Sequence, residues 1–199
     1  MKRLLFVAPL LAACVSVAPP SFAAPNCSAP FLIDVTFTNG ARWRMCWEER
    51  TLEGLVLHDV YYTPATGAAE RLVLSQANLA QTHVPYDDNS ARFFDLTSQG
   101  MGGNDFEILA PAECPGGTLL ANSGRNVVCE TIEDRGYQYK FHTIQRQAQS
   151  LSLLTSSQFI NYNFLTRITL NDDGSIEPYI GLTGRLSDRK STRLNSSHG

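Results

Sequence analysis

The chain has 199 residues, of which 43% are hydrophobic and 18% charged, and its formal net charge is −3. A chain of this size and composition can bury a core as one ordinary globular domain. The charge is nearly balanced and no run of Lys or Arg interleaves with aromatic residues, which argues against nucleic acid or an acidic membrane surface as a partner.

The first 23 residues are organised as an export signal. Lys2 and Arg3 precede an apolar stretch at 4–18, and small residues follow up to Ala23. The apolar stretch is shorter than the roughly 20 residues of a spanning helix, so no transmembrane segment is predicted. Residues 11–14 also fit a lipoprotein cleavage box, which leaves two outcomes open: cleavage after Ala23, or a lipid anchor on Cys14. Either outcome predicts an exported protein, periplasmic or secreted.

The rest of the chain is patterned as strands. Alternation predicts strands at 31–38 and 41–48, joined by a two-residue turn at Asn39-Gly40, with Trp43, Met45 and Trp47 on one face. Runs of β-branched and aromatic residues predict further strands at 55–63, 71–75, 106–109, 126–132, 137–142, 151–156, 159–170 and 175–186. No segment carries a sustained helical period. The sequence therefore predicts an all-β fold, an antiparallel β-sandwich.

Residues 188–199 differ in character from the strands before them. They are polar and have no apolar face. Their sequence resembles a translated sequencing adapter, so we expect the native sequence to diverge near Ser187. A polar disordered tail is the alternative.

Four cysteines remain once Cys14 is assigned to the signal: Cys27, Cys46, Cys114 and Cys129. An even number in an oxidising compartment predicts disulfides. Three pairings are possible, and local spacing favours Cys27 with Cys46 and Cys114 with Cys129, each worth about 3 kcal/mol in the chain-entropy model. A metal cluster is the alternative, but no Cys-x-x-Cys and no His at close spacing accompanies these four.

Four stretches, in order, resemble the enzyme domain of copper/topaquinone amine oxidases across most of 42–186. They are GLVLHDVYY at 54–62; VPYDD at 84–88 with FFD at 93–95 and GMG at 100–102; CPGG at 114–117 with CETIEDRG at 129–136; and NYNF at 161–164 with DGSIE at 173–177 and LTG at 182–184. The resemblance implies that residues 27–187 are a partial catalytic domain, a β-supersandwich that is incomplete at its C-terminus.

The family's cofactor signature is Thr-x-x-Asn-Tyr-Asp/Glu-Tyr, whose first Tyr is oxidised to topaquinone with the help of copper and dioxygen. The resemblance assigns this position to Tyr162. Gln158, Asn163 and Phe164 depart from the signature. Without the resemblance, a tyrosine between two asparagines on a strand is a half-buried packing residue.

Other site residues follow from the same resemblance. It assigns the catalytic base to Asp95, a hydrogen bond to a quinone oxygen to Tyr86, a wedge against ring rotation to Asn161, and a gating position to Phe93. A carboxylate at Asp95 is suited to remove a proton from the carbon next to the amine nitrogen.

Copper in this family is held by a His-x-His pair and a third His, all downstream of the cofactor tyrosine. His58, His83 and His142 precede Tyr162 without forming His-x-His, and His198 lies in the tail. No metal ligand is therefore assigned.

The implied reaction converts a small primary amine, dioxygen and water to an aldehyde, ammonia and hydrogen peroxide, in a homodimer. The missing ligands and the departures from the signature predict that the 199-residue chain is inactive. The alternative is a non-catalytic exported binding or structural module with the same fold.

Overall fold

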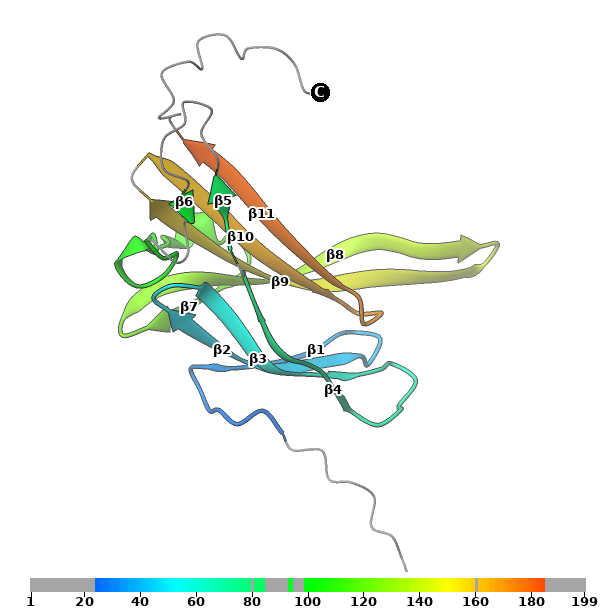
Figure 1. Ribbon diagram of the computed structural model, residues 1–199. Coiled ribbons are helices and arrows are strands. Elements are labelled where there is room, and N and C mark those ends of the chain that lie inside the picture. Colours follow the sequence, from blue (N-terminus) through cyan, green and yellow to red (C-terminus); the bar gives the residue numbers. More distant parts are fainter. Residues whose placement is uncertain (1–23, 80, 85–92, 95–98, 160, 185–199) are drawn as a thin grey trace, which may run out of the picture.

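The computed structural model describes residues 24–79, 81–84, 93–94, 99–159 and 161–184. Within them the chain forms two antiparallel sheets that face each other, a small separate hairpin and no α-helix (Figure 1). The predicted antiparallel sandwich is therefore confirmed. The predicted signal at 1–23 and the tail at 188–199 lie outside the described residues.

The first sheet has the order β1-β2-β3-β4 and the second has the order β11-β10-β9-β8-β7. The strands of the first sheet are β1 (Leu32–Thr36), β2 (Arg42–Arg50), β3 (Gly54–Thr63) and β4 (Arg71–Asn78). Those of the second are β7 (Thr118–Asn122), β8 (Arg125–Phe141), β9 (Ile144–Phe159), β10 (Tyr162–Asn171) and β11 (Ile176–Gly184). The hairpin pairs β5 (His83–Val84) with β6 (Phe93–Phe94), and two 3₁₀ turns are η1 (Gly103–Asp105) and η2 (Pro111–Glu113).

The core lies between the two sheets. Trp43, Met45 and Trp47 of β2 share one face, as the alternation predicts, and all are buried. They belong to one apolar cluster with Leu151 and Leu153 of β9 in the opposite sheet. Burying a side chain of this size contributes about 1.5–3 kcal/mol, so this face fixes the pairing of the sheets.

Hydrogen bonds tie the turn after β10 to the first sheet. The Trp43 indole donates to the carbonyl of Asn171 at 2.9 Å, and the Tyr62 hydroxyl donates to the carbonyl of Asp172 at 3.0 Å. The amide of Asn39 donates to the Asp172 carboxylate at 2.7 Å. These bonds satisfy the polar tips of large aromatic side chains inside the sandwich.

The turn between β1 and β2 differs from the prediction. The N–H of Phe37 donates to the carbonyl of Ala41 at 2.8 Å, which closes a three-residue loop at 38–40 instead of a two-residue turn. Gly40 has a φ of 89°. A glycine in the left-handed region at the last loop position is typical of three-residue hairpins, and an Asn-Gly pair serves both loop types.

Several predicted strand limits were also wrong. The runs at 126–132 and 137–142 are one strand, β8, because Gly136 (φ 74°) is absorbed as a register shift. The run at 159–170 is divided between two strands, because β9 ends at Phe159 and β10 begins at Tyr162. The run at 106–109 forms a single bridge, from Phe106 to Ser157. Strands β5, β6 and β7 were not predicted.

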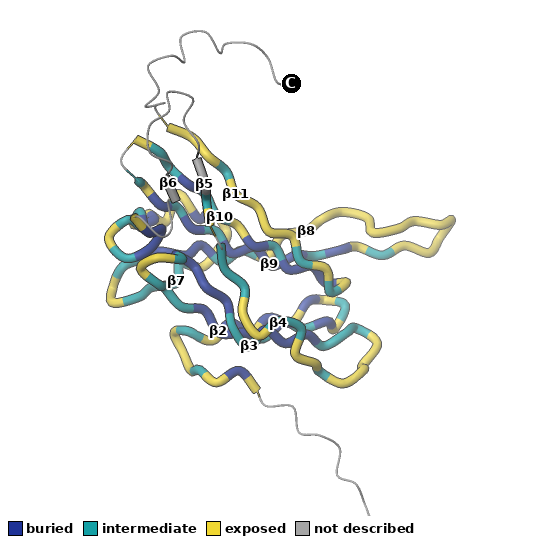
Figure 2. The backbone as a smooth tube through the Cα atoms, in the orientation of Figure 1, coloured by how far each residue is buried: buried dark blue, intermediate teal, exposed yellow. Residues whose placement is uncertain are grey.

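The outer halves of β8 and β9 form a two-stranded ribbon. Strand β10 pairs with β9 between Ser150 and Phe159, so residues 144–149 pair with β8 alone. The ribbon extends beyond the sandwich, and its outer part is exposed, whereas Ala148 near its base is buried (Figures 1 and 2). Its large exposed apolar side chains are Tyr137, Tyr139, Phe141 and Ile144.

Candidate functional site

Tyr162 is the first residue of β10 and pairs with Phe159 on one side and Gly184 on the other. Its side chain is half-buried. It packs against a small apolar cluster formed by the buried Met101 and Phe164. Tyr162 and Phe164 are two residues apart on a strand and therefore lie on the same face of the sheet. The phenol is thus partly shielded by apolar side chains.

Met101 connects two of the stretches that carry the resemblance. It lies in the GMG stretch, and its carbonyl accepts a hydrogen bond from the Ser157 hydroxyl at 2.6 Å. Its N–H donates to the carbonyl of Leu52 at 2.8 Å. The chain that leaves the predicted base segment is thereby held between β9 and the β2–β3 turn, next to Tyr162.

Gly184 allows β11 to lie close to the backbone before Tyr162. A Cβ at Gly184 would lie 2.2 Å from the carbonyl oxygen of Asn161 and 2.8 Å from the Cα of Tyr162, and its φ is 143°. No other residue type fits these distances without displacing the strand. Asn161 itself is exposed in the turn between β9 and β10, directly before Tyr162.

Asn163 and Phe164, which depart from the signature, occupy different surroundings. The amide of Asn163 donates to the Ser156 hydroxyl at 2.9 Å, on the face opposite Tyr162. There it lines a cavity of about 360 Å³ together with Glu107 and Glu113. Phe164 is only 1% exposed, in apolar surroundings where a hydroxyl would need a partner.

Two predicted site residues, Asp95 and Tyr86, lie outside the described residues. Phe93 is described only as a backbone position of β6, paired with Val84. Their assigned roles therefore stay predictions.

A larger groove of about 460 Å³ lies between β4 and the β10–β11 hairpin. Its lining is mainly aliphatic and includes Leu74, Ile168, Ile176 and Ile180. Of the predicted site residues whose side chains the structure describes, Asn161 and Tyr162 do not line this groove.

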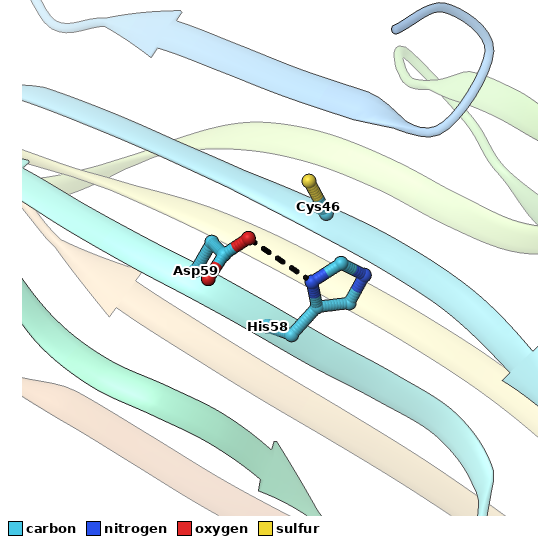
Figure 3. A group of neighbouring side chains, drawn as sticks. All are labelled: Cys46, His58 and Asp59. Atoms are coloured by element: carbon cyan, nitrogen blue, oxygen red, sulfur yellow. Dashed lines mark ion pairs between the residues drawn. The ribbon is translucent and has the colours of Figure 1, made fainter. Parts of the chain in front are cut away.

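The described histidines do not form a copper site. His58 lies on β3, whereas His142 lies in the turn at the tip of the ribbon, with its ring against Phe141. Within the described residues, the one group of potential ligands is Cys46, His58 and Asp59, whose ligand atoms lie within 4.8 Å of one another (Figure 3). It offers a single imidazole, and this set does not fit the three-imidazole copper site of the resembled family.

Both favoured disulfides are present. Cys27 is bonded to Cys46, and Cys114 is bonded to Cys129. A Cβ at Gly117 would lie 2.7 Å from the Cys114 sulfur and 2.5 Å from the carbonyl oxygen of Glu130. The second glycine of CPGG is thus required by the close approach of the loop to its own disulfide.

Titratable groups with perturbed pKa values lie elsewhere in the fold. Burial raises the pKa of Glu130 on β8. Burial, followed by the charge of Asp173, raises the pKa of the Tyr62 hydroxyl. Hydrogen bonds from the hydroxyl and N–H of Ser175 lower the pKa of Asp173. These groups belong to the sheets and to the β10–β11 turn.

Comparisons with known proteins bear on family and fold. The family model "Copper amine oxidase, enzyme domain" matches residues 35–199. A copper-containing benzylamine oxidase from Hansenula polymorpha has a similar fold, with a TM-score of 0.62, 21% identity, and coverage of 87% of this chain and 30% of that chain. Pichia pastoris lysyl oxidase PPLO is similar with a TM-score of 0.55, 15% identity, and coverage of 71% and 21%. No curated protein matches the chain.

The chain thus spans 30% and 21% of the lengths of these two structures. Among the residues that the structure describes, no helix is long and apolar enough to cross a membrane.

Proposed function

The chain belongs to the copper amine oxidase family, as part of its enzyme domain, and we propose from this that the protein is an exported primary-amine oxidase with Tyr162 at the cofactor position. The proposed reaction converts a primary amine, dioxygen and water to an aldehyde, ammonia and hydrogen peroxide. The main support from the fold is the half-buried placement of Tyr162 against Met101 of the GMG stretch.

In this proposal the protein's own residues do three things. Met101 and Phe164 exclude water from one side of the Tyr162 ring. The absence of a side chain at Gly184 lets β11 lie against the backbone at Asn161. This contact fixes the backbone position from which the Tyr162 ring extends. Asp95 removes the proton from the substrate carbon next to nitrogen, while Tyr86 and Asn161 orient the ring. A quinone made from Tyr162 would supply an electrophilic carbonyl for the amine.

Copper does not fit the described residues, because they bring no three imidazoles together. The 199-residue chain is proposed to make no quinone by itself, since oxidation of a phenol to a quinone requires a redox metal and dioxygen at the ring.

The non-catalytic module remains the second candidate, and one observation favours it. Asn163 replaces the acid of the signature, and its amide is hydrogen-bonded to Ser156 within the sheet. A neutral residue with a structural partner is what a fold that had lost its chemistry would retain.

The turnover of an Asp95 variant tests whether Asp95 is the catalytic base. The coding DNA is first resequenced across the codon for Ser187, and the protein is expressed from the confirmed gene with copper. In a peroxide-coupled amine assay, Asp95→Asn should lower turnover by about 10²–10⁴-fold, because an amide cannot accept the proton. A redox-cycling quinone stain should stay positive.

Asp88→Asn is the matched control in the same segment and should retain turnover. Wild-type-like turnover in Asp95→Asn would move the base elsewhere. A confirmed gene product that neither stains nor oxidises any primary amine would favour the non-catalytic module.

Export and a homodimer belong to the same proposal. Two disulfides support an oxidising compartment. Cleavage after Ala23 and a lipid on Cys14 remain the two alternatives for the signal. The exposed apolar ribbon of β8 and β9 supports a partner surface, which we assign to a second copy of the protein.

A further inference from the structure

Two consecutive residues of β3, His58 and Asp59, direct their side chains toward the same sulfur, that of Cys46 on β2 (Figure 3). Successive side chains on a regular strand point to opposite faces. Here the β2–β3 register shifts between Arg44 and Cys46, and Asp59 has a φ of 51°. Bulges of this kind re-aim side chains, and non-glycine residues with positive φ cluster at functional sites.

The three groups form a compact donor set. A sulfur of Cys46, a ring nitrogen of His58 and a carboxylate oxygen of Asp59 lie within 4.8 Å of one another. The His58 Nδ1 lies 3.4 Å from the Asp59 Oδ2. The side chains of His58 and Asp59 are 28% and 36% exposed, so an ion in solution can reach them. Cys46 itself is fully buried, and Cys27, which is not one of the three clustered groups, is joined to it through the disulfide.

Thiolate, imidazole and carboxylate are the ligands that Zn²⁺ takes in four-coordinate sites. We propose that Cys27, Cys46, His58 and Asp59 form a latent zinc-binding site, closed while the disulfide is intact and opened when a thiol reductant cleaves it. Two reductant thiols supply two electrons and two protons and become a disulfide, and Cys27 and Cys46 become thiols. The bound ion then displaces the two thiol protons.

The second disulfide of the chain has different surroundings. Cys114 and Cys129 lie in an apolar cluster with Leu109 and partly buried leucines. Within the described residues, no imidazole or carboxylate joins them in a potential ligand group. The pair Cys114–Cys129 is therefore an internal control of equal sulfur content. The proposed zinc site is independent of Tyr162 and of the proposed oxidase activity.

Cobalt titration tests the site, because Co²⁺ replaces Zn²⁺ and is visible. The purified protein is reduced with a phosphine under nitrogen and titrated with Co²⁺. We expect sulfur-to-cobalt charge-transfer and tetrahedral d–d bands that Zn²⁺ abolishes, and none from the oxidised protein. Cys114→Ser/Cys129→Ser should retain the bands, and Cys27→Ser/Cys46→Ser should lose them.

The imidazole and carboxylate are tested separately. His58→Ala and Asp59→Asn should each weaken Co²⁺ binding by at least the roughly 10–100-fold that loss of an outer-sphere partner costs. His142→Ala should have no effect. Because reduction can unfold the chain, Cys27→Ser provides a second route: it frees Cys46 without a reductant and should bind Co²⁺ through three protein ligands.

Three results would overturn the proposal. They are equal binding by the oxidised protein, bands that survive Cys27→Ser/Cys46→Ser, and wild-type affinity in both His58→Ala and Asp59→Asn. Wild-type affinity in both variants would leave the Asp59 carboxylate with a structural role. It accepts a hydrogen bond from the N–H of Asn26 at 3.3 Å and so anchors the N-terminal segment.

Discussion

Gly184 restricts what can stand beside the cofactor position. Gly184→Ala should destabilise the protein by about 1–3 kcal/mol, since the new methyl group would overlap the carbonyl of Asn161, 2.2 Å away, at a strained φ. Denaturant unfolding measures the loss. Gly124→Ala is the matched control: it also has a positive φ, of 80°, but no atom within 4 Å of a Cβ. Equal losses in both variants would mean that backbone strain alone, and not contact with Asn161, decides the cost.

Glu130 is held in a position that penalises its charge. Burial raises the pKa of its carboxyl in the folded state. The stability that this carboxyl contributes is therefore fully present below its pKa in the unfolded chain, about 4.3. It is lost as the pH rises through the pKa of the carboxyl in the folded protein. Glu130→Gln should raise Tm at pH 7 and leave Tm unchanged near pH 3, where both side chains are neutral. Glu133→Gln, exposed on the same strand, is the control, and an equal rise there would point to net charge as the cause.

Single residues were predictable where strand periodicity is regular. Alternation predicts Trp43, Met45 and Trp47 on one face of their strand, and all three are buried in the core. The neighbours of Cys46 were not predictable. His58 is its cross-strand partner, and Asp59 joins it only because of a bulge, which leaves no mark in sequence spacing.

At the scale of elements, the Cys114–Cys129 loop joins the start of β7 to β8. Replacing both cysteines with Ala should lower the unfolding free energy by about 2–4 kcal/mol, because the cross-link limits the unfolded chain. Guanidinium unfolding under non-reducing conditions measures it. Removing the Cys27–Cys46 disulfide should lower the unfolding free energy by a similar amount, because its cysteines are 19 residues apart and those of the other disulfide are 15 apart. No change of midpoint in either variant would contradict a stabilising role.

The ribbon of β8 and β9 carries the predicted partner surface. Tyr139→Lys/Phe141→Ser should raise the dimer dissociation constant at least about tenfold, because apolar contact area at the ribbon tip would be lost. Sedimentation equilibrium measures this. Leu72→Ser, at an exposed leucine on β4 of the other sheet, should leave association unchanged. A dimer that tolerates the ribbon variant would place its interface elsewhere.

Elements were predicted best where apolar residues alternate, as in β2, or form a long continuous run, as in β3. The prediction failed at boundaries. A glycine inside β8 was interpreted as a break, whereas a run interpreted as one strand is divided between β9, which ends at Phe159, and β10, which begins at Tyr162. The ribbon was missed because its extent depends on where β10 stops pairing with β9, at Ser150. A pattern confined to one segment does not contain that information.

At the scale of the whole molecule, the family match predicts an amine oxidase site, and the described residues contain only part of such a site. Residues 35–199 match the enzyme domain, yet the chain spans 30% of the length of the benzylamine oxidase structure. The described part brings Tyr162, Asn161 and the GMG stretch together without a set of copper ligands. The sandwich and the family were thus predictable from the motifs. The metal side of the site was not, because the described residues bring no three imidazoles together.

The central claim is that Tyr162 is the tyrosine that becomes the cofactor. Peptide mass spectrometry tests it most directly, on protein expressed from the resequenced gene and incubated with copper and air. The peptide containing Tyr162 should gain two oxygens and lose two hydrogens, and the same peptide of the 199-residue chain should stay unmodified. An unmodified Tyr162 in a protein that oxidises amines, or the same mass change on another tyrosine such as Tyr86, would contradict the claim.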